Sequence, residues 1–225
     1  MTPETYQANL KRLFEKWQQN TGLSIEGKTF SPDGIVCPEI WFNENNKPKI
    51  LFVLKETNRW CNLCKYVVKE NAKWQTWNNI ARWTYLLRHL HDKSIEEIWQ
   101  HVKSINTFQR INNLNHIALV NIKKRPGGKS TNSHTLIEEF KRSNKTYILD
   151  EIALFGHVDY IVCCGKGIAH CISQCYNSLR WKNKVAITPE GTVVIDFLHP
   201  QARSKKKDML KQLYELASQA SRPTA

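Results

Sequence analysis

Three side chains that could do acid–base or hydrogen-bonding chemistry stand directly after short apolar runs of this chain. They are Glu56, Asn121 and His199. A carboxylate beside an apolar strand can lose solvation and become a usable base. An amide presents both a donor and an acceptor, as reading a nucleobase edge requires, and a neutral imidazole can donate to developing negative charge.

Each of these side chains also has an ordinary structural explanation. Glu56 could cap the turn that follows it, Asn121 could satisfy turn backbone, and His199 could order its own loop. Taken singly, each residue leaves both interpretations open. His199 precedes a rigid proline and a run of Lys and Arg residues, which favours a functional role there.

The apolar runs predict the elements that would position these residues. Four short apolar runs predict buried strands, at 50–54, 116–121, 158–164 and 192–198. Helical spacing predicts helices at about 3–19, 77–87, 132–155 (as two helices) and 202–217, and Ser94 with Glu97 forms a capping box for another.

Strands that alternate with helices predict an α/β fold with a three-layer, mostly parallel central sheet of about four strands flanked by helices. We expect a single domain over 1–225, because no repeat or long linker interrupts the chain. In open α/β sheets, ligands bind beyond the carboxyl ends of the strands. Glu56, Asn121, Gly165 and His199 would then converge at one edge.

The charge balance indicates a polyanionic partner. The chain has 33 Lys and Arg against 20 Asp and Glu, a net charge of +13. Its pI is near 9.5, above the value of about 9 that marks candidate nucleic-acid-binding domains. Two clusters adjoin the loops above: Lys123, Lys124, Arg125 and Lys129, and Arg203, Lys205, Lys206, Lys207 and Lys211.

Composition narrows the class of protein. No apolar run approaches the roughly 20 residues of a membrane span, and the polar first residues lead us to expect no secretory signal. The seven cysteines form no compact disulfide framework, which fits a reducing cytoplasm. We therefore expect a cytoplasmic, monomeric protein with no membrane partner.

Three further motifs have weaker support. Trp60 lies in the loop beside Glu56 and could stack a base. The turn at residues 127–129 resembles a Walker phosphate loop, but Lys123 stands where that pattern needs its first glycine. Cys61 and Cys64 have the spacing of a metal-binding pair, whereas the cysteines at 171 and 175 do not, so we expect no bound metal and no cofactor.

Taken in order, these segments resemble the uracil-DNA glycosylase superfamily over roughly residues 48–215. The similar segments are Leu51–Asn58, Leu119–Pro126, Tyr160–Ala169 and Phe197–Arg203. Each motif is short, and the order and spacing of the four carry the resemblance.

The resemblance implies hydrolysis of the N-glycosidic bond of uracil or a related deaminated or damaged base, flipped out of single- or double-stranded DNA. Glu56 and His199 would be catalytic. Asn121, Asn58 and Trp60 would bind the base. The DNA would be held by Lys123, Lys124, Arg125, Lys129, Gly165, Lys166, Gln201, Arg203, Lys205 and Lys206.

The chain departs from the family pattern at several positions. Leu54 and Thr57 stand where the first motif has glycine and proline, and Gln201 stands where serine is usual. Cys61 and Cys64 follow the first motif, whereas the iron–sulfur branch has its CxxC pair before it. These departures leave a catalytically inactive nucleic-acid-binding protein on the same fold as the alternative.

Overall fold

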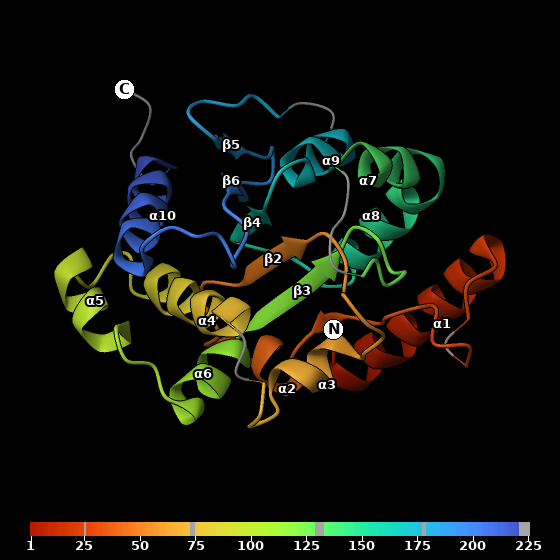
Figure 1. Ribbon diagram of the computed structural model, residues 1–225, viewed down its shortest axis with the longest axis horizontal. Helices are drawn as coiled ribbons and strands as arrows, with labels where there is room; N and C mark the ends of the chain where they lie inside the picture. The colour runs from red at the N-terminus through yellow and green to blue at the C-terminus, as the bar shows by residue number, and fades with distance from the viewer. Residues whose placement is uncertain (25, 73–74, 129–132, 177–178, 221–225) are drawn as a thin grey trace.

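A six-stranded sheet runs through the centre of the protein. The computed structural model describes residues 1–24, 26–72, 75–128, 133–176 and 179–220. Within these residues the strand order is β1-β3-β2-β4-β6-β5 (Figure 1). The strands are β1 (Gly34–Ile35), β2 (Ile50–Leu54), β3 (Ile117–Asn121), β4 (Tyr160–Cys164), β5 (Val185–Ile187) and β6 (Val193–Phe197).

The four strands predicted from apolar runs form the parallel centre of this sheet. β2 pairs in parallel with β3 and β4, and β4 pairs in parallel with β6. Every residue of β2, β3 and β4 is buried, the pattern of strands that are covered on both faces. The loops that follow these four strands therefore leave from the same edge of the sheet.

The prediction of about four strands was wrong at the two edges, and the sheet is mixed. β1 pairs antiparallel with β3, and β5 pairs antiparallel with β6. β1 has 2 residues and β5 has 3, which is too short for a period-two pattern to stand out in the sequence. Short edge strands limit pairing with other chains.

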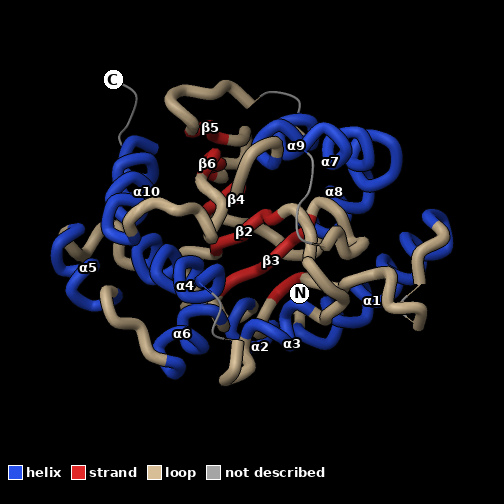
Figure 2. Tube along the Cα trace, in the orientation of Figure 1, coloured by secondary structure: helices blue, strands red, loops and turns tan. Residues whose placement is uncertain are grey.

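Helices cover both faces of the sheet, as Figure 2 shows. The alternation of side chains along β2 illustrates the division: Ile50, Phe52 and Leu54 enter one apolar cluster, and Leu51 and Val53 enter the other. The first cluster takes residues from α3 (Leu63–Val67), α4 (Gln75–Arg88), α5 (Ile95–Val102), α6 (Thr107–Leu114) and α10 (Lys206–Ala220). The second takes them from α1 (Pro3–Thr21), α2 (Pro38–Trp41), α7 (Ser133–Glu139), η1 (Phe140–Asn144), α8 (Lys145–Ala153) and α9 (Ile168–Cys175).

Local signals place several helix ends where they were expected. The side chain of Thr2 caps α1, proline opens the helix, and Gly22 ends it in the left-handed conformation at φ +66°. The predicted capping box of Ser94 and Glu97 is present at the start of α5. α10 begins at Lys206, later than the expected 202, because the turn after His199 occupies the intervening residues. No helix in the described ranges is both long and apolar enough to cross a membrane.

Candidate functional site

The carboxyl ends of β2 and β3 and the loop after β6 border a pocket of about 1050 Å³. Glu56, Asn121 and His199 all line it, as the parallel topology predicted. Asn58, Trp60 and Gln201 line it as well. A smaller pocket of about 490 Å³ lies near the amino ends of the strands and contains none of the predicted residues. The larger pocket is therefore the candidate site.

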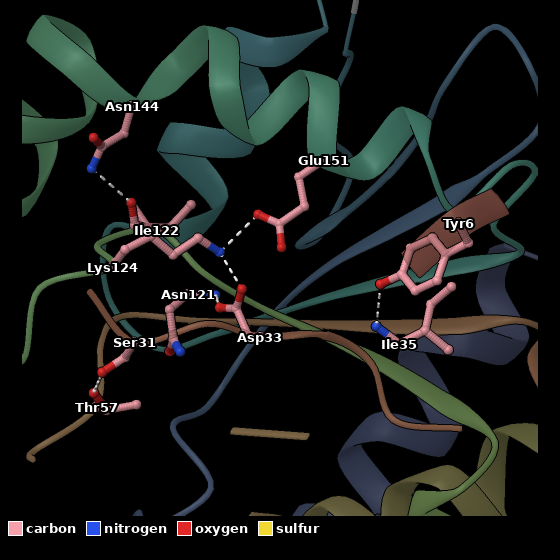
Figure 3. Close-up of polar contacts among 10 residues, drawn as sticks. All are labelled: Tyr6, Ser31, Asp33, Ile35, Thr57, Asn121, Ile122, Lys124, Asn144 and Glu151. Atoms are coloured by element: carbon pink, nitrogen blue, oxygen red, sulfur yellow. Dashed lines mark hydrogen bonds and ion pairs between the residues drawn. The ribbon is translucent and has the colours of Figure 1, made fainter. Parts of the chain in front are cut away.

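Asn121 is the most unusual residue of the pocket. It ends β3, is 1% exposed, and its backbone N–H donates to Oδ2 of Asp33 at 2.6 Å (Figure 3). Its side-chain Nδ2 and Oδ1 are both buried without a hydrogen-bond partner among the described residues. Leaving a buried donor and acceptor unpaired costs free energy, and most native proteins avoid it. This amide is therefore available to a ligand that presents a complementary donor and acceptor.

A buried ion cluster binds the backbone of Asn121 through Asp33. The ammonium of Lys124 pairs with Asp33 and, at 2.7 Å, with Oε2 of Glu151, and all three side chains are fully buried. In Figure 3 these three side chains meet on one side of Asn121, and its amide points away from them. The cluster joins the loop before β1, the end of β3 and α8.

Lys124 was predicted to bind DNA, and that prediction is wrong. Its charge is used inside the protein, where two carboxylates and the faces of Trp17 and Phe14, at 5.2 and 5.5 Å from the ammonium, surround it. Lys123, the residue before it, instead pairs with Glu56, so the two neighbouring lysines have different surroundings. A run of cations in a sequence does not reveal this difference.

The protonation of the cluster follows from its burial. Burial, together with the charge of Asp33, raises the pKa of Glu151 well above its usual value despite the nearby ammonium. Burial alone would lower the pKa of Lys124, but the two carboxylates outweigh it and raise that pKa. These shifts favour the neutral carboxyl form of Glu151 and the charged form of Lys124, which reduces the net charge that a dry interior must hold.

Glu56 is held between a cation and a glycine. Its carboxylate, 4% exposed, pairs with Nζ of Lys123 at 2.7 Å. A Cβ built on Gly127 would lie only 1.7 Å from Oε1 of Glu56, so any other residue at position 127 would require the carboxylate to move. The N–H of Gly127 donates to the carbonyl of Thr57 and is not free to bind a phosphate. Lys123, which was predicted to contact DNA, is thus paired with Glu56.

His199 is fixed in one tautomer. Its Nδ1 accepts the backbone N–H of Gln201 at 3.1 Å, so the neutral ring carries its proton on Nε2. Gly165 lies buried against this ring: at φ +110° a Cβ would be 3.6 Å from Cδ2 of His199. Gly165, predicted as a DNA contact, therefore packs against His199.

The charge of Lys55 contributes to the pKa of His199. Burial, and to a lesser extent the charge of Lys55, lower the pKa of His199 below its usual value. The neutral ring should then persist at a more acidic pH than for a solvated histidine. We expect Lys55→Gln to raise the pKa of His199, because the repelling charge is removed, as measured by an NMR titration of the imidazole. Lys103→Gln, in the exposed segment after α5, should leave it unchanged; equal values in wild type and Lys55→Gln would contradict the assignment.

No protein-family model matches this chain, and no curated protein matches it in sequence. The chemistry of the pocket itself must therefore indicate the function. That chemistry combines a buried carboxylate, an unpartnered amide and a neutral imidazole with a fixed proton. Among the described residues, no group of three or more His, Cys, Asp or Glu side chains could hold a metal ion.

The remaining predicted cations that the structure describes lie outside the pocket lining. Arg125 is exposed and pairs with Glu139 at 3.3 Å. Lys166, Arg203, Lys205 and Lys206 are exposed. Lys129 lies outside the described residues.

Sequence reasoning missed the cations that do line the pocket, which are Lys55, Arg59, Lys65 and Lys69. They are interspersed with apolar and amide residues, so they form no run that stands out by charge. Their place directly after the first predicted strand was the signal that could have found them. Asp33 and Glu151 were missed as well, since nothing local marks either as a partner of Lys124.

Proposed function

We propose that this protein is a DNA glycosylase that hydrolyses the N-glycosidic bond of a deaminated or damaged base, such as uracil, after the base has left the stack. The observation that carries the proposal is the unpartnered amide of Asn121, buried in the same pocket as Glu56 and His199. A flipped base is read by hydrogen bonds to its edge. The four motif loops of the suggested superfamily follow the four parallel strands, which supports the resemblance.

The proposed reaction separates charge between the sugar and the base. When the C–N bond breaks, its electrons remain on the base and the sugar becomes an oxocarbenium-like cation. The Nε2–H of His199 would donate to the anionic base, and Glu56 would stabilise the cation and position the water that attacks it. The water gives its oxygen to the sugar, and one proton neutralises the departing base.

Exposed cations around the pocket would hold the DNA backbone. Arg203, Lys205 and Lys206 follow the His199 loop, and Lys166 follows Gly165. Binding through phosphates releases counterions, so the affinity should fall steeply as salt rises.

A glycosylase screen tests the proposal. Oligonucleotides carrying uracil, hypoxanthine, xanthine or an alkylated base, in single and double strands, would be incubated with the protein and treated with alkali to cleave abasic sites. We expect cleavage at one or more of these bases and none in the undamaged oligonucleotide. If the protein binds these oligonucleotides but produces no abasic site in any of them, the proposed glycosylase activity is refuted.

A second function is favoured by one specific observation. The carboxylate of Glu56 is paired with Lys123 and covered by Gly127, so in this conformation its charge is partly offset within the pocket wall. A catalytically inactive nucleic-acid-binding protein on this fold would show that arrangement permanently. Gel-shift titration beside the screen separates the two functions, because the inactive protein would bind DNA without producing abasic sites.

Asn121→Ala should weaken base recognition without weakening the fold. The substitution removes an amide that has no partner in the free protein, so the free energy of unfolding should not fall by more than about 1 kcal/mol. Loss of a bidentate base contact should lower excision about 5- to 150-fold. The measurements are single-turnover excision and chemical denaturation.

Asn79 provides a matched control for Asn121. It is equally buried, but its amide donates to the carbonyl of Pro200 at 2.7 Å and accepts from Arg82 at 2.9 Å. Asn79→Ala should therefore lower the free energy of unfolding by about 1–3 kcal/mol. If Asn121→Ala destabilises the protein as much as Asn79→Ala, the amide of Asn121 has a structural role.

A further inference from the structure

One wall of the pocket carries, besides Glu56 and Asn58, side chains that the proposed bond cleavage does not use. This wall, which we call the 55–69 wall, is the segment from Lys55 to Lys69, most of whose residues line the pocket. It contains an exposed aromatic side chain, Trp60, and four cations that border the pocket, of which Arg59, Lys65 and Lys69 are exposed. Aromatic faces beside cations are the features by which proteins hold single strands of nucleic acid.

Trp60 presents a fixed aromatic face. It is 37% exposed, and its indole N–H donates to the carbonyl of Phe30 at 2.9 Å, which holds the ring in place. The ammonium of Lys28 lies 5.9 Å from the centre of the ring. Trp77 lines the same pocket but is buried. Of these two tryptophans, Trp60 is therefore the one on which a base could stack at the surface of the protein.

The cations of the 55–69 wall are not neutralised. Within the part of the chain that the structure describes, no carboxylate lies within 4.0 Å of the charged groups of Arg59, Lys65 or Lys69, the distance at which an ion pair is counted. Lys123 and Arg125, by contrast, are paired with glutamates. Exposed cations without partners attract phosphates, and no ion pair within the protein has to be broken when they bind a phosphate.

The size of the pocket also points to more than one nucleotide. At about 1050 Å³ it lies at the top of the range of roughly 300–1000 Å³ found for pockets that enclose drug-sized ligands. A single base bound at Asn121 would occupy only part of this volume.

We propose that the 55–69 wall binds a segment of single-stranded DNA, with the base next to the excised one stacked on Trp60 and the phosphates running past Arg59, Lys65 and Lys69. The inference rests on the proposed function, and it specifies that the substrate is single-stranded. In a duplex, neighbouring bases cover both faces of each base. A base can therefore stack on Trp60 only in a single strand, where one of its faces is free.

Lesion-free oligonucleotides test this inference separately from excision. Fluorescence anisotropy would compare a labelled single strand of DNA with the duplex and with a single strand of RNA of the same sequence. We expect the DNA single strand to bind most tightly. Trp60→Ala should weaken its binding at least about fivefold, the loss of one base–aromatic stack, and Trp60→Phe should keep most of the affinity. Trp181→Ala is the matched control, because Trp181 is 36% exposed and lies outside the pocket lining.

The salt dependence of binding tests the cations. Lys65→Gln and Lys69→Gln should each lower the slope of log K against log salt concentration by about 0.7 for the single strand, and Lys103→Gln should not. Circular dichroism would verify that each variant is folded. Equal or tighter binding of duplex or RNA, or equal affinities of Trp60→Ala and Trp181→Ala, would overturn the inference. Abasic-site formation in the screen would stand in either case, so the two proposals can fail independently.

Discussion

His199→Ala and Glu56→Gln should each lower the single-turnover excision rate by about 10²–10³-fold while DNA affinity changes little. His199 supplies a donor whose proton is already placed on Nε2 by the hydrogen bond from Gln201, and a donor that needs no reorganisation has its full effect in the transition state. Glu56→Gln keeps the shape of the side chain and removes the negative charge that would face the sugar cation. Both residues act on charge that develops only during bond cleavage, so the ground-state complex should form almost normally.

Controls separate this loss of rate from damage to the fold. His170→Ala and Glu190→Gln change the same residue types at exposed positions outside the pocket lining. Both should excise at the wild-type rate. If His199→Ala or Glu56→Gln excises as fast as these controls, the assignment of that residue is wrong. If a variant loses DNA affinity and thermal stability together, its effect is structural.

Lys124→Ala should lower the free energy of unfolding by about 3–5 kcal/mol, because the substitution leaves a buried carboxylate without its cation. For a chain of this size, that corresponds to a fall in the thermal midpoint of roughly 6–20 °C. Chemical denaturation followed by circular dichroism would measure the change. A surface lysine that contacts phosphates would give the opposite result, with weaker DNA binding and an unchanged midpoint.

Glu151→Gln provides the contrast within the same cluster. Folding shifts the pKa of Glu151 toward the neutral form, and Glu151→Gln keeps the shape of the side chain, so this substitution should cost less than the loss of Lys124. Lys123→Ala, at the neighbouring position but outside the cluster, should also cost less. Comparable destabilisation by all three variants would show that the buried ammonium has no special role.

The sequence was sufficient to predict the topology that forms the pocket. Apolar runs of about five residues stood out against the polar loops, and the loops between them were long enough for helical crossovers, so β2, β3, β4 and β6 could be predicted as parallel. Parallel strands place their carboxyl ends together, and this was enough to bring Glu56, Asn121 and His199 into one pocket. The convergence of the residues at the strand ends could therefore be predicted from the pattern of apolar runs and the parallel topology that it implies.

Side-chain pairing could not be predicted in the same way. Lys123 and Lys124 are adjacent and chemically alike, yet one pairs with Glu56 at the pocket and the other is buried between Asp33 and Glu151. Their partners lie 67, 91 and 27 positions away, respectively, so no local pattern links them. The two edge strands were missed for a related reason, because their short segments become strands only by pairing with β3 and β6.

The buried cluster behind Asn121 has a consequence for how this chain can vary. Because Lys124 compensates Asp33 and Glu151, exchanging the lysine alone is costly, whereas replacing all three with well-packed apolar residues could be close to neutral for the cluster itself. Such a triple replacement would still remove the acceptor for the backbone N–H of Asn121. Among natural homologues we therefore expect positions 33 and 151 to change wherever position 124 loses its positive charge, and a protein engineer could replace Lys124 only together with its two partners, with a substitute acceptor supplied at position 33.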